Sequence, residues 1–173
     1  MTDTALQTKI KGLIRDIPDF PKPGILFRDI TTLLADKEGL HVACEAMAEP
    51  FRGKGVELVI GAESRGFIFG VALAHSLKCG FVPIRKPGKL PFKKLSESYA
   101  LEYGTDSLEI HADAVKPEQK VLLCDDLLAT GGTMGACCRM VEKLGGEIVG
   151  ISFLIELGFL NGRETLGNYE VKT

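Results

Sequence analysis

The residues most able to do chemistry are two adjacent carboxylates that are followed by a loop of small side chains. An apolar run, Val121–Cys124, leads into Asp125 and Asp126, and a helical pattern begins after Ala129-Thr-Gly-Gly-Thr133. Small side chains let backbone N–H groups close on an anion, and the helix that follows adds the positive end of its dipole. This order predicts a strand, an acidic tip, a phosphate-binding loop and a helix.

The acidic pair indicates what the ligand carries besides its phosphate. Ionised carboxylates accept hydrogen bonds from hydroxyl groups, so the pair suits the vicinal hydroxyls of a ribose. The lysine of a Walker A loop and the glycine spacing of a dinucleotide fingerprint are both missing from the sequence. The alternative is an ordinary strand-to-helix turn with two surface aspartates. We assign a ribose 5-phosphate half-site to Asp125, Asp126, Ala129, Thr130, Gly131, Gly132 and Thr133.

A second strand, loop and helix precede the first. Residues 56–61 predict an apolar strand and residues 67–78 an apolar helix, and the loop between them ends in Glu63-Ser-Arg-Gly66. Backbone amides at a helix start and a guanidinium fork suit a diphosphate. The alternatives are a serine cap beside a surface arginine, a solvated basic loop, or an Arg85 that reaches a neighbouring subunit. We assign diphosphate binding to Glu63, Ser64, Arg65, Arg85, Lys86 and Lys89.

The elements that must position these loops alternate between strands and helices. Further strands are predicted at 80–85, where Pro83 indicates an edge or terminal position, at 107–111 and at 148–157. Helices are predicted at 4–17, at 37–54 and from the phosphate loop to Leu144, with irregular segments at 20–30 and 85–106 and a loosely structured tail from Asn161. We therefore expect an α/β fold, with a mainly parallel, twisted sheet flanked by helices in a single domain over residues 1–173. Ligands bind such sheets at the carboxyl ends of the strands, where these loops lie.

Composition limits the functional classes. At 173 residues, a net charge of −2 and a pI of about 6.0, the chain is suited to one folded domain and not to a binder that neutralises nucleic-acid phosphates. The N-terminus lacks an apolar signal core and no run is long enough for a membrane span, so we expect a soluble, cytoplasmic protein. Five cysteines without metal-type spacing predict free thiols, with a redox pair at Cys137 and Cys138 as the alternative. We predict no metal ligand from the protein.

Several motifs together resemble those of the type I phosphoribosyltransferases. Besides residues 121–133, they are Phe27-Arg-Asp-Ile30, Glu63-Ser-Arg-Gly-Phe67, the stretch 84–91 and Tyr103-Gly104, and the resemblance covers about Ile14 to Leu166. The stretch Asp125–Thr133 resembles the adenine-specific version of the signature. The resemblance implies transfer of the 5-phosphoribosyl group from 5-phosphoribosyl-1-diphosphate to adenine, giving AMP and diphosphate in purine salvage. It also implies Mg²⁺ carried by the diphosphate, and a homodimer.

The resemblance also implies roles for residues outside the two phosphate loops. A mobile lid loop at about 87–106 would bring Glu102 next to the purine as a base, while Arg65 and Lys89 would act on the leaving diphosphate; a solvated loop carboxylate is the alternative for Glu102. An apolar N-terminal plug is the alternative for the stretch at about 1–35, which would form an N-terminal helix and then a hood that binds adenine. In it, the backbone groups of Leu26 and Arg28 would meet the edge of the base and Phe27 would stack on its face, with Leu157 as an apolar wall.

Two other functions remain open at this point. The same fold could act on a different nucleobase, such as hypoxanthine, guanine or a pyrimidine. It could also bind phosphoribosyl diphosphate without catalysis, as a sensing domain; against this, the sequence shows no spare DNA-binding extension and its net charge is negative. A preference for a base other than adenine would indicate the first alternative. Binding without turnover would indicate the second.

Overall fold

The computed structural model describes residues 3–100 and 105–173. The chain divides into two compact units, one reaching to Ala46 and the other formed by Met47–Thr173. The helix α3 (Lys37–Ala48) begins in the first and ends in the second.

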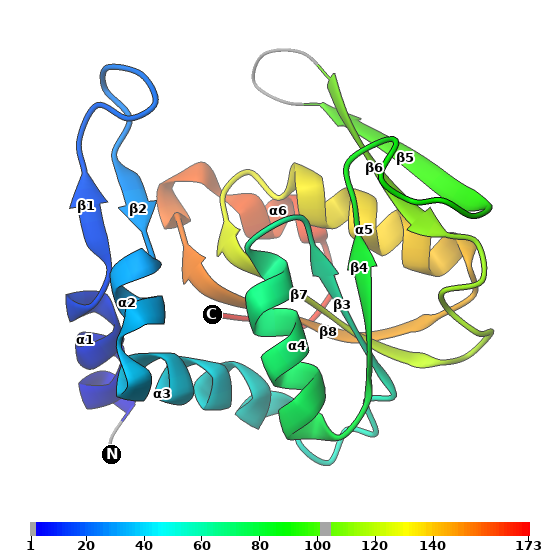
Figure 1. The fold of residues 1–173 in the computed structure, drawn as a ribbon, viewed down its shortest axis with the longest axis horizontal. Coiled ribbons are helices and arrows are strands. Elements are labelled where there is room, and N and C mark those ends of the chain that lie inside the picture. Colours follow the sequence, from blue (N-terminus) through cyan, green and yellow to red (C-terminus); the bar gives the residue numbers. More distant parts are fainter. Residues whose placement is uncertain (1–2, 101–104) are drawn as a thin grey trace. The chain divides into compact units, whose positions relative to one another are not determined.

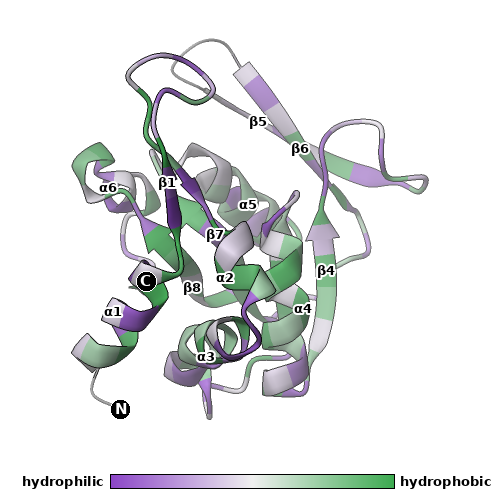
Figure 2. Ribbon diagram, turned by 60° about the vertical axis from the view of Figure 1, so that its left-hand side comes forward, coloured by the Kyte–Doolittle hydropathy of each residue, from purple (hydrophilic) through white to green (hydrophobic). Residues whose placement is uncertain are grey.

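The first unit contains a short antiparallel hairpin between helices. Its other elements are α1 (Asp3–Gly12), β1 (Arg15–Ile17), β2 (Phe27–Asp29) and α2 (Thr31–Ala35). The prediction of one helix over 4–17 is wrong: α1 ends at Gly12, and Arg15–Ile17 pairs in register with Phe27–Asp29. Glycine terminates helices readily, and strand pairing then satisfies the backbone groups that follow. In Figure 2 β1 has a largely hydrophilic colour, as its residues Arg15 and Asp16 require.

The second unit is built on a parallel sheet, as predicted (Figure 1). Its strand order in the described part of the chain is β4-β3-β7-β8-β9, and every neighbouring pair is parallel. The strands are β3 (Leu58–Ala62), β4 (Gly80–Ile84), β7 (Lys120–Leu128), β8 (Glu147–Glu156) and β9 (Val171–Lys172). The edge position predicted from Pro83 is confirmed, because β4 is the outer strand next to β3.

Two long helices, α4 (Gly66–Leu77) and α5 (Gly132–Lys143), pack on this sheet. In β3, Leu58 and Ile60 join the apolar core that includes Met140 and Val141 of α5. Gly61 points the other way, because a Cβ built on it would come 2.8 Å from the carbonyl oxygen of Gly66 in α4. Alternate residues of a strand face opposite sides of a sheet, so α4 and α5 cover opposite faces. The helix predicted at 37–54 ends early, at Ala48, and a 3₁₀ turn, η1 (Glu49–Phe51), accommodates its proline.

The segment predicted to be irregular up to residue 106 is largely a hairpin. The strands β5 (Lys94–Ala100) and β6 (Thr105–His111) pair antiparallel, and an isolated bridge between Arg85 and Glu109 joins β6 to the end of β4. The polarity of this hairpin reflects its exposed face and does not exclude strand structure. Residues 101–104, between β5 and β6 in the chain, lie outside the described residues.

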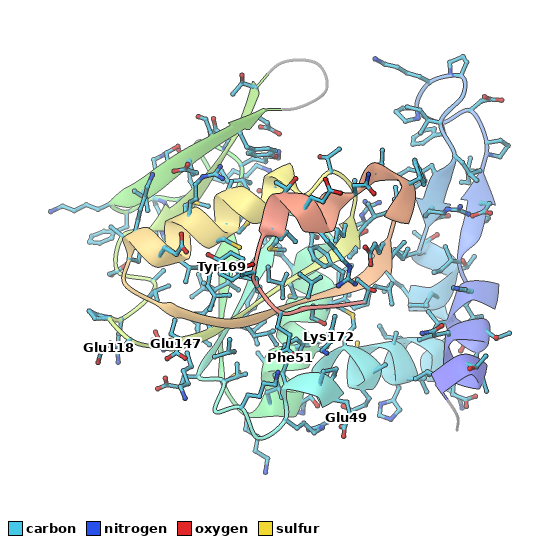
Figure 3. All side chains as sticks on the ribbon, turned by 180° about the vertical axis from the view of Figure 1, so that it is seen from behind. Glu49, Phe51, Glu118, Glu147, Tyr169 and Lys172 are labelled. Atoms are coloured by element: carbon cyan, nitrogen blue, oxygen red, sulfur yellow. The ribbon has the colours of Figure 1, made fainter. Side chains whose placement is uncertain are left out.

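The prediction of a loosely structured C-terminal tail is also wrong. The chain forms a 3₁₀ turn, η2 (Gly158–Leu160), then α6 (Gly162–Leu166), and finally β9, which pairs with β8. In Figure 3 Tyr169 points toward α5, where its hydroxyl group donates a hydrogen bond to Glu142. Glu118 and Glu147 mark the amino ends of β7 and β8 in the same view, at the opposite end of these strands from the phosphate loop.

Candidate active site

The carboxyl end of β7 leads directly into the phosphate loop, residues 129–133. The prediction that the strand stops before the two aspartates is wrong in one respect, because β7 continues to Leu128 and Asp125 pairs with Phe153 of β8. Pairing with a neighbouring strand, and not side-chain polarity, sets where a strand ends. The loop then lines a cavity of about 70 Å³ whose walls are Asp125, Leu127, Leu128, Ala129, Thr130, Gly131, Gly132, Thr133, Met134 and Phe153.

The backbone of this loop has the form that the glycines predict. Gly131 has a φ of +84° and caps the amino end of α5, which begins at Gly132. The first N–H groups of an α-helix have no partner within the helix and carry its positive end, so they attract an anion. The seven residues assigned to the ribose 5-phosphate half-site are therefore brought together around one cavity, with the exception of Asp126, which belongs to β7 but is not part of the cavity wall.

The acidic pair lies in a largely buried environment. Burial raises the pKa of the Asp125 carboxyl well above its usual value, and the neighbouring charge of Asp126 raises it further. Burial also raises the pKa of Asp126, although the positive charge of Arg65 opposes that shift. Both carboxyls therefore favour the protonated form more than a solvated aspartate does, and a ligand that donates hydrogen bonds would stabilise their ionised form.

Arg65 joins the two predicted phosphate loops. Its Nε atom lies 2.7 Å from Oδ2 of Asp126, an ion pair without the alignment of a good hydrogen bond. The backbone makes a second link, because a Cβ on Gly66 would come 2.8 Å from Oδ1 of Asp125. The absence of a side chain at Gly66 thus lets the start of α4 lie against the acidic pair. The loop that ends in Arg65 also contains a cis peptide between Glu63 and Ser64, and Ser64 is exposed.

Glu63 gathers the basic residues that follow β4. Its carboxylate forms ion pairs with Lys89 and with Arg85, whose Nε is 3.1 Å away, and it accepts a 2.7 Å hydrogen bond from the backbone N–H of Lys86. Burial opposes ionisation, but the hydrogen bonds from Lys89, Lys86 and Arg85 outweigh it and lower the pKa of Glu63 to about 2. Glu63 therefore stays ionised and holds these cations beside the Arg65 loop.

The Lys86 side chain has different partners from its backbone. Its ammonium group is paired with Asp106 and lies 3.2 Å from the hydroxyl oxygen of Tyr99, both on the hairpin. Burial works against its charge, but the hydrogen bond with Asp106 raises the pKa of Lys86 overall. Sequence reasoning missed Asp106 and Tyr99, because nothing in the local pattern of the hairpin indicates which cation each would meet.

The residues assigned to adenine are divided between the two units. Leu26, Phe27 and Arg28 lie at or next to β2, where the ring of Phe27 packs edge-on against that of Phe20 at 5.2 Å and Arg28 is paired with Asp16. In the second unit, the N–H of Leu157 donates a 2.9 Å hydrogen bond to the carbonyl of Leu128, next to the phosphate loop. Their contact with a base stays a prediction. Glu102, predicted as the base, lies outside the described residues.

Three further features concern the cysteines, membrane spans and clusters of metal-ligating side chains. None of the five cysteines forms a disulfide bond in the described residues, and Cys44, Cys124, Cys137 and Cys138 are buried. Over residues 3–100 and 105–173, no helix has both the length and the apolar character needed to cross a membrane. In the same residues no three side chains of His, Cys, Asp or Glu gather as metal ligands would.

Comparison with known proteins gives one consistent result. The phosphoribosyl transferase domain family matches residues 31–166. The adenine phosphoribosyltransferase of Acidobacterium capsulatum is 57% identical over 162 residues, which are 94% of this chain and 90% of that protein. The crystal structure of the adenine phosphoribosyltransferase of Rhodothermus marinus has 52% identity and a TM-score of 0.94, covering 99% of this chain and 98% of its own.

A more distant structure carries ligands. The Saccharomyces cerevisiae adenine phosphoribosyltransferase, complexed with an imino-altritol bisphosphate and adenine, has 36% identity and a TM-score of 0.92 and covers 98% of each chain. The similarities span both units and the segments that carry the two loops. The chain therefore belongs to the phosphoribosyl transferase family, and within it to the adenine phosphoribosyltransferases.

Proposed function

We propose that the protein transfers the 5-phosphoribosyl group from 5-phosphoribosyl-1-diphosphate to adenine, releasing AMP and diphosphate. The observation that carries this proposal is the contact between Arg65 and Asp126, which joins a loop suited to a diphosphate to a loop suited to a ribose 5-phosphate. A single substrate with a phosphate at each end of its ribose would occupy both. The relatives that match nearly the whole chain are named adenine phosphoribosyltransferases, and the yeast structure contains adenine.

In this reaction a nitrogen of the base forms a bond to carbon 1 of the ribose while the bond from carbon 1 to the diphosphate breaks. Positive charge develops on the sugar ring and negative charge on the leaving diphosphate, so catalysis consists of positioning, charge neutralisation and exclusion of water. The phosphate loop would hold the 5-phosphate, and Asp125 and Asp126 would accept hydrogen bonds from the ribose hydroxyls. Arg65 and Lys89, with Arg85 and Lys86, would neutralise the diphosphate.

The acidic pair also fits a magnesium ion that arrives with the diphosphate. Mg²⁺ keeps several waters and takes few protein ligands, and the two carboxylates of Asp125 and Asp126 can accept hydrogen bonds from such waters. When bound, the ion would neutralise charge on the leaving diphosphate. No protein ligand to the metal is needed for this arrangement.

Adenine is the acceptor for which the hood and the lid are proposed. Backbone groups of Leu26 and Arg28 would read the amino group of the base, which distinguishes adenine from 6-oxopurines because donor and acceptor are exchanged at that position. Phe27 and Leu157 would supply apolar contacts, and Glu102 would accept a proton from the purine when the lid closes. Desolvation on closure raises the pKa of a carboxylate toward the range of a useful base.

A base competition assay tests the proposal. The protein is incubated with phosphoribosyl diphosphate, Mg²⁺ and equal amounts of labelled adenine, hypoxanthine, guanine and uracil, and the nucleotides formed are separated. We expect AMP as the main product. Preference for a 6-oxopurine would refute the adenine assignment, and binding of phosphoribosyl diphosphate without any nucleotide product would indicate a sensing domain instead.

We also propose that the protein is a cytoplasmic homodimer. Ile68 and Val71, on one face of α4, are 42% and 54% exposed, and we take this apolar face as the candidate interface. Free thiols are typical of proteins in a reducing compartment. Light scattering that gives the mass of one chain would refute the dimer.

A further inference from the structure

The short helix α6 lies directly behind the phosphate loop. A Cβ on Gly131 would come within 2.5 Å of the carbonyl oxygen of Gly162, and a Cβ on Gly162 would collide with the carbonyl of Ala129. Two glycines therefore let the backbones of the loop and the helix approach without a side chain between them. In Figure 1, α6 lies beside α5, the helix that the loop begins.

Thr165 makes the polar contact between these two segments. Its hydroxyl group donates a 2.8 Å hydrogen bond to the carbonyl oxygen of Thr130. The peptide from Thr130 to Gly131 is trans, so its C=O and N–H point in opposite directions. By holding the carbonyl toward α6, Thr165 turns the N–H of Gly131 away from α6. Thr165 is not part of the wall of the cavity, so its effect on a ligand would act through the loop.

The helix that carries Thr165 is itself held in place. Arg163 donates through Nε and Nη2 to the two carboxylate oxygens of Glu156, at 2.8 and 2.7 Å, and through Nη1 to the carbonyl of Val171 at 2.9 Å. A bidentate arginine–carboxylate pair fixes orientation as well as distance. The anchor joins α6 to β8 and β9, so α6 is a fixed support against which the loop can be oriented.

We propose that Thr165 is a positioning residue for the phosphate loop, holding the Thr130 carbonyl so that the loop keeps its anion-binding form. This inference rests on the proposed function, because it assigns the loop to the 5-phosphate of the substrate. The 5-phosphate is remote from the reacting carbon and is bound equally in the ground state and the transition state. Loss of the Thr165 hydroxyl therefore weakens binding of 5-phosphorylated ligands and leaves the chemical step nearly unchanged.

Steady-state kinetics of three variants test the proposal. Thr165→Val keeps the shape and removes the hydroxyl, and we expect the KM for phosphoribosyl diphosphate to rise about three- to tenfold, the loss of one neutral hydrogen bond, while kcat changes less than about twofold. Thr165→Ser keeps the hydroxyl and should restore the wild-type KM. Thr8→Val is the matched control, because Thr8 also donates a 2.8 Å hydrogen bond to a carbonyl, that of Thr4 in α1. It should leave both constants unchanged.

Comparing the affinities for AMP and for adenosine, measured by calorimetry, isolates the contribution of the phosphate group to binding. Thr165→Val should weaken AMP binding by about the same factor as it raises KM and should leave adenosine binding unaffected. A wild-type KM in Thr165→Val, equal losses for AMP and adenosine, or a Thr165→Ser variant as impaired as Thr165→Val would each overturn the proposal. Because Thr165 is exposed, the variants should fold, and their unfolding midpoints verify this. A wild-type protein that binds AMP but makes none would refute the proposed function and leave this test intact.

Discussion

Arg65 Nε lies 2.7 Å from Oδ2 of Asp126, so the arginine of one phosphate loop touches the acidic pair that precedes the other. The contact crosses between the carboxyl ends of two adjacent parallel strands, β3 and β7. Because Asp126 is largely buried, Arg65 provides positive charge where the protein would otherwise have two uncompensated carboxylates. In the proposed reaction the same guanidinium group would also face the negative charge of the leaving diphosphate.

Replacing Arg65 should therefore damage catalysis more than folding. For Arg65→Gln we expect kcat to fall by about 10²-fold or more, as when one donor to developing negative charge is removed. Arg65→Lys should recover part of the loss, since lysine restores the charge but not the planar fork. Initial rates with saturating substrates provide the measurement. Arg52→Gln, which removes a surface pair with Glu49, is the control, and a drop in its kcat would show that the assay reports general damage.

Asp125 makes folding stability depend on pH. Burial, followed by the charge of Asp126, raises the pKa of Asp125 well above 3.8. The folded chain then holds a proton at pH values where the unfolded chain has released it. The free energy of unfolding is therefore greatest below the pKa of Asp125 in the unfolded chain, and it falls as the pH rises toward the pKa in the folded chain. Asp125→Asn should unfold at a higher temperature than the wild type near neutral pH, by about 2–4 °C for each kcal/mol gained, and should lose activity.

The advantage of Asp125→Asn should shrink as the pH falls toward about 4, where a solvated aspartate is itself half protonated. The difference in unfolding temperature is measured at several pH values, with circular dichroism as the probe of unfolding. Exposed Asp113 offers the matched control, Asp113→Asn. An Asp125→Asn variant less stable than the wild type at every pH would contradict the sign of the shift.

Glu97 should control local opening of the β5–β6 hairpin. It lies 2.7 Å from Nε of Arg139 and 2.5 Å from Nζ of Lys143, both on α5, and hydrogen bonds from Lys143 and Arg139 lower its pKa. In Glu97→Gln we expect faster amide hydrogen exchange in the hairpin with a change of less than about 1 kcal/mol in global stability, because exposed pairs contribute little. Glu147→Gln, at the amino end of β8, is the control and should leave hydrogen exchange in the hairpin unchanged. Equal exchange in all three proteins would rule out this anchor.

Gly70 should be intolerant of any side chain. A Cβ there would collide with the ring of Phe81 and come 3.3 Å from Sγ of Cys124, so Gly70→Ala should cost about 1–3 kcal/mol through overpacking. Gly12→Ala, with open space around its Cβ at the end of α1, should be neutral or stabilising by up to about 1 kcal/mol. Urea unfolding of both variants compares the two, and similar midpoints would refute the packing argument.

Glu102 is predicted to be the base. Glu102→Gln should bind adenine and phosphoribosyl diphosphate with little change and lose kcat by about 10²–10⁴-fold, the usual range for general acid–base catalysis. Substrate affinity by calorimetry and turnover by AMP formation separate the two effects. Glu147→Gln is the comparison, because it removes an exposed carboxylate at the amino end of β8, away from the phosphate loop. Undiminished turnover in Glu102→Gln would remove the assignment.

Much of the second unit could be predicted because its strands are buried on both faces. Apolar runs such as Val121–Cys124 have few interpretations in a chain of alternating elements, and Pro83 restricts its strand to an edge. The phosphate loop was equally clear, because Gly131 must adopt a positive φ that other residues avoid. These features depend on a few neighbouring residues, and so a sequence displays them directly.

The remaining features depend on partners that are distant in the chain. Residues 13–17 fit a helical pattern, yet Arg15–Ile17 pairs with β2. The polar tail becomes α6 through the ion pair between Arg163 and Glu156, which polarity alone does not indicate. For the same reason the sequence identified Lys86 and Lys89 as cations near the site but not Asp106 and Glu63 as the carboxylates they meet.

The two outer strands of the sheet have a consequence for how copies of the chain can associate. β4 carries Pro83, which has no N–H to donate, and β9 is only two residues long. Neither offers the row of unpaired backbone groups that another strand needs in order to add to a sheet. A continuous sheet running from one molecule into the next is therefore disfavoured, which protects the folded protein from edge-to-edge aggregation and directs self-association to side-chain surfaces such as the exposed face of α4.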